Sequence, residues 1–155
     1  MKRWLVLTAA VALIAALSPF KGTDVGKLRP AQWVYLSRQG NVLCLETDTG
    51  DRGVGADVAA ALKDLRRCAP GEMFLETADY ALVSREAQEA LPQLRKVLRS
   101  GVEVCLAEES PDENTAAYLM THNPGLTLRG YLSGQGALPV LTSQDGRWKI
   151  IGRQK

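Results

Sequence analysis

The order of apolar and polar residues along the chain predicts an alternation of strands and helices. Runs of apolar and β-branched residues bounded by turn residues are typical of strands. Two boundaries are clear: Gln39-Gly40-Asn41 separates the first two runs, and Asp145-Gly146, a pair favoured in type I′ turns, separates the last two. The strands are expected at residues 31–37, 42–48, 102–107, 138–142 and 147–151, with one strand or two short ones between 73 and 83.

Three segments carry apolar residues at the spacing of an amphipathic helix. Asp57 and Ser84 are placed to cap the first two, and Pro92 is expected to kink or divide the second. Ser110 begins the third, with a proline next to it, an acidic first turn and Glu113 at the capping-box position. The helices are expected at residues 57–68, 84–98 and 110–121, with a short turn or helix around 127–132.

These elements predict one α/β domain. Strands that alternate with helices form a sheet covered by helices, here a mixed β-sheet packed with about three helices. The expected order is ββαβαβα plus a C-terminal β-hairpin. The chain has 155 residues, of which 46% are hydrophobic and 23% charged, which is enough for one core but not two. Residues 31–155 are assigned to this domain and residues 21–30 to a linker.

The first residues predict a segment directed to a membrane. Residues 1–3 are basic at Lys2 and Arg3, and residues 4–17 carry no charge. As a helix, this run would span about 21 Å, short of the ~30 Å hydrocarbon core, which favours a signal peptide over a full span. A cut after residue 18 would leave a proline first, which signal peptidases disfavour. Residues 1–20 are therefore a signal peptide or an N-terminal membrane anchor, and the protein is expected at the extracytoplasmic face of the cell membrane, or secreted if the leader is removed.

The charge balance excludes one class of partner. Nineteen Lys and Arg against seventeen Asp and Glu give a net charge of +2, which falls to zero without Lys2 and Arg3. A neutral domain with 6% aromatic residues lacks the basic surface that supplies most nucleic-acid affinity. No nucleic-acid partner is therefore expected.

The cysteines and the single histidine do not form a catalytic or metal-binding pattern. Cys44 and Cys105 lie in apolar strand segments, where a thiol behaves as a small hydrophobic side chain. With Cys68 they show neither zinc spacing nor a disulfide framework, although one bridge between two of the three stays open. His122 ends a predicted helix, where a capping or surface role is favoured over a triad with Cys105. No catalytic residue, metal or cofactor is expected.

One loop has the composition of a ligand-binding site. Glycines before a helix can present backbone amides to an anion, and aspartates can bind a cation, although the spacing fits neither a P-loop nor an EF-hand. In open α/β sheets ligands bind at the carboxyl ends of the strands, where this loop is expected to lie. It supports an alternative function as a small exported ligand-binding or enzymatic domain. The candidate ligand-binding residues are Asp48, Asp51, Arg52, Gly53 and Gly55.

A longer stretch of the chain resembles a known family, and the likeness covers roughly residues 53–120. It lies in the helix Gly55-Ala56-Asp57-Val58-Ala59-Ala60-Ala61-Leu62-Lys63-Asp64-Leu65, the strands around Phe74-Leu75 and Tyr80–Ser84, the helix from Glu86 to Leu98, and the strand Val102–Ala107. These residues resemble the N-terminal domain of the Ger(x)C family, the C-subunit proteins of spore germinant receptors. A second likeness, to a hairpin of the same family, lies at Leu138–Leu141 and Ile150–Gly152.

The resemblance implies a setting rather than a reaction. It implies a non-catalytic protein on the outer face of the inner membrane of an endospore-forming bacterium, in an assembly that senses germinants. Family members are lipoproteins, whereas no cysteine follows the apolar run here. The matching positions are packing and capping residues, so no functional residue is carried over. The expected function is an exported or membrane-tethered protein-interaction module, with the membrane and other membrane germination or sporulation proteins as partners.

Overall fold

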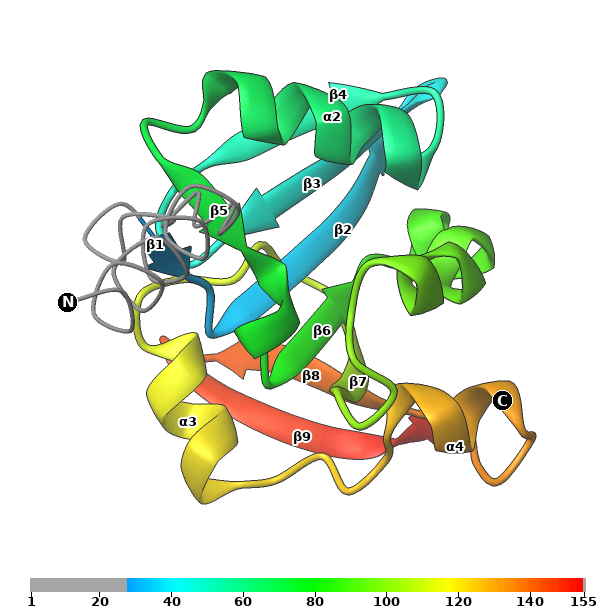
Figure 1. The fold of residues 1–155 in the computed structure, drawn as a ribbon. Coiled ribbons are helices and arrows are strands. Elements are labelled where there is room, and N and C mark those ends of the chain that lie inside the picture. Colours follow the sequence, from blue (N-terminus) through cyan, green and yellow to red (C-terminus); the bar gives the residue numbers. More distant parts are fainter. Residues whose placement is uncertain (1–27, 155) are drawn as a thin grey trace, which may run out of the picture.

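The computed structural model describes residues 28–154, which fold around one seven-stranded sheet (Figure 1). The strand order is β4-β3-β2-β6-β7-β8-β9, and a separate two-stranded sheet pairs β1 with β5. The strands are β1 (Leu28–Pro30), β2 (Trp33–Gln39), β3 (Val42–Thr47), β4 (Arg52–Gly55), β5 (Glu72–Phe74), β6 (Tyr80–Val83), β7 (Glu103–Ala107), β8 (Leu138–Gln144) and β9 (Arg147–Gln154). The helices are α2 (Val58–Cys68), α3 (Thr115–Thr121) and α4 (Leu128–Leu132), with 3₁₀ segments η2 (Leu75–Thr77) and η3 (Arg85–Lys96).

The sheet is mixed, as the sequence predicts. Strands β2, β6, β7 and β8 run parallel to one another, whereas β3 and β9 pair antiparallel with β2 and β8 at the two sides, and β4 pairs antiparallel with β3. Asp145 and Gly146 both have positive φ, 53° and 71°, as the type I′ turn between β8 and β9 requires. The α/β class and the C-terminal hairpin are therefore confirmed.

Helices cover both faces of the sheet. On one face, α2, η3 and α4 bury a large core that includes Leu36, Leu65 and Leu94. On the other face, α3 packs on a smaller core that contains Trp33, Leu82 and other residues of the parallel strands. The side carrying α2, η3 and α4 is called the helical face below.

Helix α2 forms as the sequence predicts. Asp57 caps it by accepting a hydrogen bond from the backbone amide of Ala60 at 2.7 Å. Val58, Ala61 and Leu65 are buried against the sheet, which is the apolar stripe expected at helical spacing. The helix therefore presents a polar outer side to solvent.

The second helix differs from the prediction in its type. Residues Arg85–Lys96 form a 3₁₀ segment with Pro92 inside it, rather than an α-helix kinked at that residue. Proline lacks the amide that an α-helix needs, and a 3₁₀ run of 12 residues is itself uncommon. Ser84 occupies the capping position but makes no side-chain cap bond, and its buried hydroxyl has no partner among the described residues. The segment is held mainly by the burial of Ala87, Ala90, Leu91 and Leu94.

The third helix begins five residues later than predicted, at Thr115 instead of Ser110. Asp112 is the cause, because its Oδ1 accepts hydrogen bonds from the Trp148 indole at 2.8 Å, the Asn114 amide at 2.9 Å and the Thr115 hydroxyl at 3.0 Å. These bonds fold the segment before the helix back onto β9. Local capping signals at Ser110 are therefore overridden by a contact between distant parts of the chain.

This network predicts a pH dependence of stability. Burial acts to raise the pKa of Asp112, but the hydrogen bonds from Trp148, Thr115 and Asn114 outweigh it and hold the pKa below the ordinary value. A lowered folded-state pKa stabilises the fold above the unfolded pKa of about 4 and loses this contribution as the pH falls through the folded pKa. The stability difference between the wild type and Asp112→Asn should therefore shrink below about pH 4 in urea unfolding. A difference that is constant from neutral to acid pH would contradict this assignment.

Two short strands were not predicted. β4 lies in the segment taken as a loop, and β1 lies in the segment taken as the end of the linker. β1 is made by distant pairing with β5, whereas β4 is a short strand that pairs with the neighbouring β3 and carries two glycines, so the composition of each gives little strand signal. The assignments of residues 1–20, as signal peptide or anchor, lie outside the described residues. Within residues 28–154, none of the helices has the length and apolar character that crossing a membrane would require.

Candidate functional site

The loop between β3 and β4, which carries the predicted ligand-binding residues, lies at the amino ends of the parallel strands. Thr47 at the end of β3 pairs with Val34 near the start of β2, because the hairpin reverses the chain direction. The Asp48 carboxylate accepts a hydrogen bond from the Gln32 amide at 2.9 Å, just before β2. The expected position at the carboxyl ends of the strands is therefore wrong, and this removes the topological argument for a ligand there.

The second aspartate of the loop is bound within the protein. Asp51 forms an ion pair with Arg29 of β1 at 3.0 Å and accepts a hydrogen bond from the Thr49 hydroxyl at 2.6 Å. Thr49 in turn lies 2.8 Å from the hydroxyl of Thr47. These contacts join the loop to β1, so Asp51 has a structural role that a cation would have to displace.

Gly53 and Gly55 allow close packing between β4 and α2. A Cβ atom on Gly53 would lie 2.2 Å from the carbonyl oxygen of Ala61, and one on Gly55 would lie 2.3 Å from the amide nitrogen of Ala61. The Asp64 carboxylate of α2 also accepts a hydrogen bond from the Val54 amide at 3.1 Å. The glycines therefore bring the strand against the helix, and their backbone is not open to an anion.

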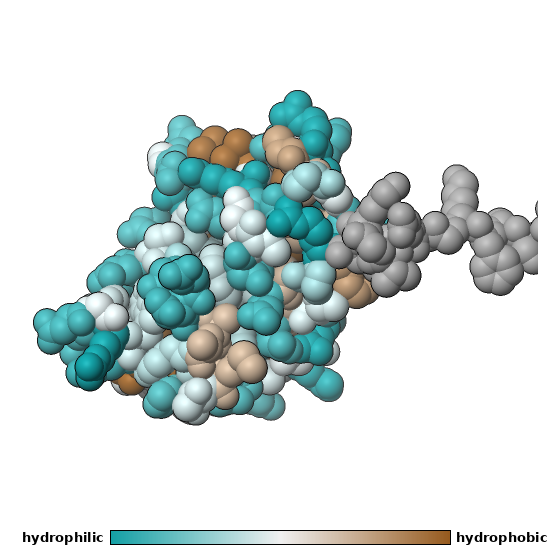
Figure 2. Space-filling model, turned by 90° about the vertical axis from the view of Figure 1, so that its left-hand side faces the viewer, coloured by the Kyte–Doolittle hydropathy of each residue, from teal (hydrophilic) through white to brown (hydrophobic). Residues whose placement is uncertain are grey.

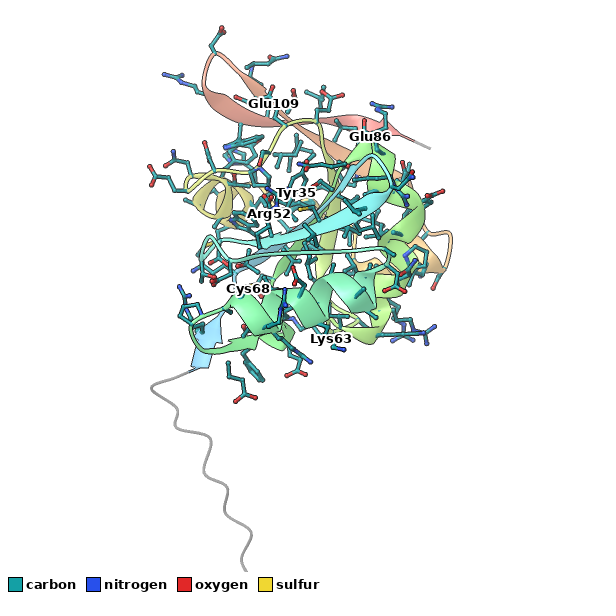
Figure 3. All side chains as sticks on the ribbon, turned by 90° about the horizontal axis from the view of Figure 1, so that it is seen from above. Tyr35, Arg52, Lys63, Cys68, Glu86 and Glu109 are labelled. Carbon is teal, nitrogen blue, oxygen red and sulfur yellow. The ribbon has the colours of Figure 1, made fainter. Side chains whose placement is uncertain are left out.

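Arg52 lies on the opposite face of the sheet from these contacts. Its Nε donates to the Cys44 thiol at 2.7 Å and lies 3.2 Å from Glu46, while Nη2 donates to Gln39 at 3.0 Å. The guanidinium thus spans β4, β3 and β2, and Figure 3 shows Arg52 and Tyr35 on one side of the sheet and Lys63 on the other. The five predicted residues are consequently not gathered around one point, and ligand binding by them stays a prediction.

The position of Arg52 predicts a change in thiol reactivity. Cys44 is fully buried, with its thiol directly under the Arg52 side chain. In a Cys68→Ser background, Arg52→Ala should raise the rate of Cys44 alkylation about tenfold, because access limits a buried thiol. Arg38→Ala is the matched control, since this arginine of β2 contacts Glu89 and the backbone of Glu86 instead. Equal rates in both variants would show that Arg52 does not shield the thiol.

Two groups that could act as catalysts, the thiol of Cys105 and the phenol of Tyr35, are buried and have a raised pKa. Cys105 is fully buried, and this burial, with Glu103 nearby, raises the pKa of its thiol far above neutrality. Burial, followed by the charges of Glu46 and Glu86, also raises the pKa of Tyr35. His122 ends α3 as predicted and stacks on Tyr118 with a ring-centre distance of 4.4 Å. No group of three potential metal ligands occurs within residues 28–154.

The carboxyl ends of the parallel strands are crossed by ion pairs. Arg38 of β2 contacts Glu89 at 2.6 Å, and Arg85 after β6 contacts Glu108 after β7 at 3.4 Å. The shallow hollow here, about 390 Å³, is lined by Arg85, Glu86, Gln88, Glu89 and Tyr131. Arg85 and Glu89 of this lining are each held in an ion pair, so they are less available to a charged ligand.

Within residues 28–154, basic side chains without an ion pair lie on β9, at Arg147 and Lys149, and in larger number on the helical face. Five exposed basic side chains there form no ion pair with a carboxylate of the described residues, unlike the six arginines that do. We call them the basic face: Lys63 and Arg66 of α2, Arg95 and Lys96 of η3, and Arg129 of α4. In Figure 1, η3 lies between α2 and α4, so the three elements form one surface.

Two hollows contain these side chains. A groove of about 460 Å³ between α2 and η3 is lined by the three basic side chains of Lys63, Arg66 and Lys96 and by one carboxylate, that of Asp57. Gln93 and the apolar side chains of Val58, Leu62 and Val97 complete it. A second hollow of about 380 Å³, between η3 and α4, is lined by Arg95 and Arg129 with Ser100, Ser133, Leu128 and Leu132. Arg95 and Lys96 are neighbours on η3, but Lys96 lines the groove on the α2 side and Arg95 lines the hollow on the α4 side, so the two hollows lie on either side of η3. This basic face is the candidate functional site.

Comparisons with known proteins give no further evidence about the function of this site. No protein-family model, curated protein or solved structure matches the chain. The resemblance to the Ger(x)C family therefore stays a prediction, and the function has to be argued from the site itself.

Sequence reasoning missed the basic face because its residues are spread over three elements. Within α2, Asp64 is paired with Arg67 at 2.7 Å, which leaves Lys63 and Arg66 uncompensated, but the sequence does not show which neighbours pair. The net charge did not indicate the basic face, because a chain whose charges balance in total can still carry them unevenly over its surface. The available signals were the basic pairs Arg66-Arg67 and Arg95-Lys96 in two predicted helices.

Proposed function

We propose that the protein is a non-catalytic binding module, exported or held at a membrane by its N-terminal segment, and that it works through the basic face. The observation that carries this proposal is the concentration of five exposed, unpaired basic side chains around two adjacent hollows. By contrast, Asp48, Asp51 and Arg52 of the loop are each bound to other residues of the domain. Charge without an internal partner is available to an external one.

The chemistry of the described residues supports binding rather than catalysis. A general acid or base needs a pKa near the working pH and a position beside the reacting group. The thiol of Cys105 and the phenol of Tyr35 are shifted away from neutrality and are buried. Figure 2 shows the side of the molecule that is at the left in Figure 1. This side is mainly hydrophilic, with hydrophobic residues in small separate areas, so a large apolar interface is not favoured there.

The setting that we propose follows from the resemblance to the Ger(x)C family and from the basic and apolar start of the chain. It is the outer surface of the cell membrane of an endospore-forming bacterium, beside germination or sporulation proteins. The alternative, a small ligand bound by the loop from Asp48 to Gly55, would require Asp51 to exchange Arg29 for the ligand. The same experiment separates the two proposals.

The test is fractionation and crosslinking of the tagged full-length chain in sporulating cells, with N-terminal sequencing of the product. We expect recovery in the membrane fraction, with the leader retained or trimmed, and loss of crosslinked neighbours in Lys63→Glu/Lys96→Glu. Arg147→Glu/Lys149→Glu, on the hairpin at the other end of the sheet, is the matched control and should retain them. A soluble protein with no crosslinked neighbour would contradict the proposal and direct attention to the loop.

A further inference from the structure

The basic face has the composition of a surface for an anionic lipid layer. Its five cations are exposed, and each hollow combines them with apolar side chains, such as Leu62 and Val97 in the groove and Leu132 in the second hollow. A phospholipid headgroup offers the same two features, a phosphate beside the start of an acyl chain. Basic side chains near an anionic membrane each strengthen binding about fivefold.

The position at which the chain enters the domain limits the distance between β1 and a membrane that holds the first residues. β1 begins at Leu28 and pairs with β5, which starts four residues after the end of α2. Ten residues, 18–27, connect it to the apolar run at 4–17, and ten residues extend at most about 35 Å. If residues 4–17 remain in the membrane, as the proposed function allows, the start of β1 stays within that distance of the lipid.

The layout of the two hollows favours lipid over an acidic peptide. A bound helix or strand needs one continuous groove with anchoring pockets in line. Here η3 separates the groove at Lys63 and Lys96 from the hollow at Arg95 and Arg129. Separate headgroups can fill separate hollows, whereas one peptide would have to cross the exposed ridge of η3.

We infer that the basic face docks on anionic phospholipid headgroups of the membrane that holds the chain. The contact orients the domain with α2, η3 and α4 toward the lipid and with the β8–β9 hairpin away from it. This inference rests on the proposed function, because it requires a domain held at a membrane. It adds the partner, a phospholipid surface of negative charge.

One exposed reporter cysteine, with Cys44 and Cys105 buried, tests the inference. The full-length chain with Cys68→Ser and Ala59→Cys, an exposed position lining the groove, is reconstituted into two kinds of vesicle. One is phosphatidylcholine alone and the other contains phosphatidylglycerol at about one lipid in four, to supply surface charge. Labelling by a membrane-impermeant maleimide reports contact with the lipid, and Gln144→Cys on the hairpin reports the far side. The same reporters are then measured in membranes isolated from the cells.

On the phosphatidylglycerol vesicles we expect Ala59→Cys to label about tenfold more slowly than on phosphatidylcholine, with Gln144→Cys unchanged. Lys63→Gln/Lys96→Gln should weaken the contact about 25-fold and restore labelling, and Arg147→Gln/Lys149→Gln should not. Salt of about 1 M should also restore it, since the Debye length falls to about 3 Å. Equal labelling on both vesicles overturns the lipid inference.

Native membranes separate this inference from the proposed function. Protection of Ala59→Cys in native membranes but not on vesicles would identify a protein partner, which overturns the lipid inference and retains the binding module. Protection in neither would contradict both.

Discussion

The variant Gly53→Ala is expected to lose about 3 kcal/mol or more of its free energy of unfolding. The added methyl group would meet the Ala61 carbonyl oxygen at 2.2 Å and the Leu65 amide nitrogen at 2.4 Å, and both are backbone atoms that cannot rotate away. Relief requires β4 to move from α2, which would also break the hydrogen bond from Val54 to Asp64. Urea unfolding at neutral pH measures the loss.

Gly101→Ala is the matched control for this prediction. A Cβ atom at Gly101 meets nothing within 4 Å, and its backbone does not have a positive φ. It should change the stability by less than about 0.5 kcal/mol. If Gly53→Ala is as stable as this control, the close contact between β4 and α2 is not present in solution. In that case the glycines would again be available to a ligand.

The variant Leu94→Ala should cost about 2–5 kcal/mol, the range for removing a fully buried leucine side chain. Leu94 is 0% exposed and anchors η3 on the sheet. Because 3₁₀ hydrogen bonds have poorer geometry than α-helical ones, η3 depends on such anchors. The variant should therefore also weaken the hydrogen-exchange protection of η3, the segment that carries Arg95 and Lys96.

Arg95→Ala is the control for this second prediction, since the neighbouring side chain is exposed and unpaired within the described residues. Its stability should lie within about 0.5 kcal/mol of the wild type. If Leu94→Ala unfolded at the same urea concentration as Arg95→Ala, η3 would be held by something other than its buried side chains. The placement of the basic face would then need revision.

The sequence predicts those parts of the fold that local signals determine. Asp57 caps α2, Asp145-Gly146 turns the last hairpin, and Cys44 and Cys105 are buried in strands, all as the pattern indicates. Each of these outcomes depends on residues within one turn or one strand. The alternation of such segments was enough to predict the α/β class.

The remaining features depend on contacts between distant residues. The bond from Trp148 to Asp112 shifts the start of α3, and the pairing of β1 with β5 turns the end of the predicted linker into a strand. Glycines such as Gly53 and Gly55 occur both in phosphate-binding loops and in tight contacts between a strand and a helix. The position of Ala61 in the structure shows that the second case applies here. The basic face is formed by residues of three elements, so no local sequence pattern predicts it.

The most direct test of the central claim, that this protein works through its basic face, is site-specific photo-crosslinking in living cells. A crosslinking amino acid is placed at position 63 or 96 on the basic face, at 48 in the loop, or at 144 on the far hairpin of the full-length chain. We predict adducts, to lipid or to protein, from positions 63 and 96 and background levels from 48 and 144. Adducts from position 48 alone would contradict the account and restore the loop as the working site.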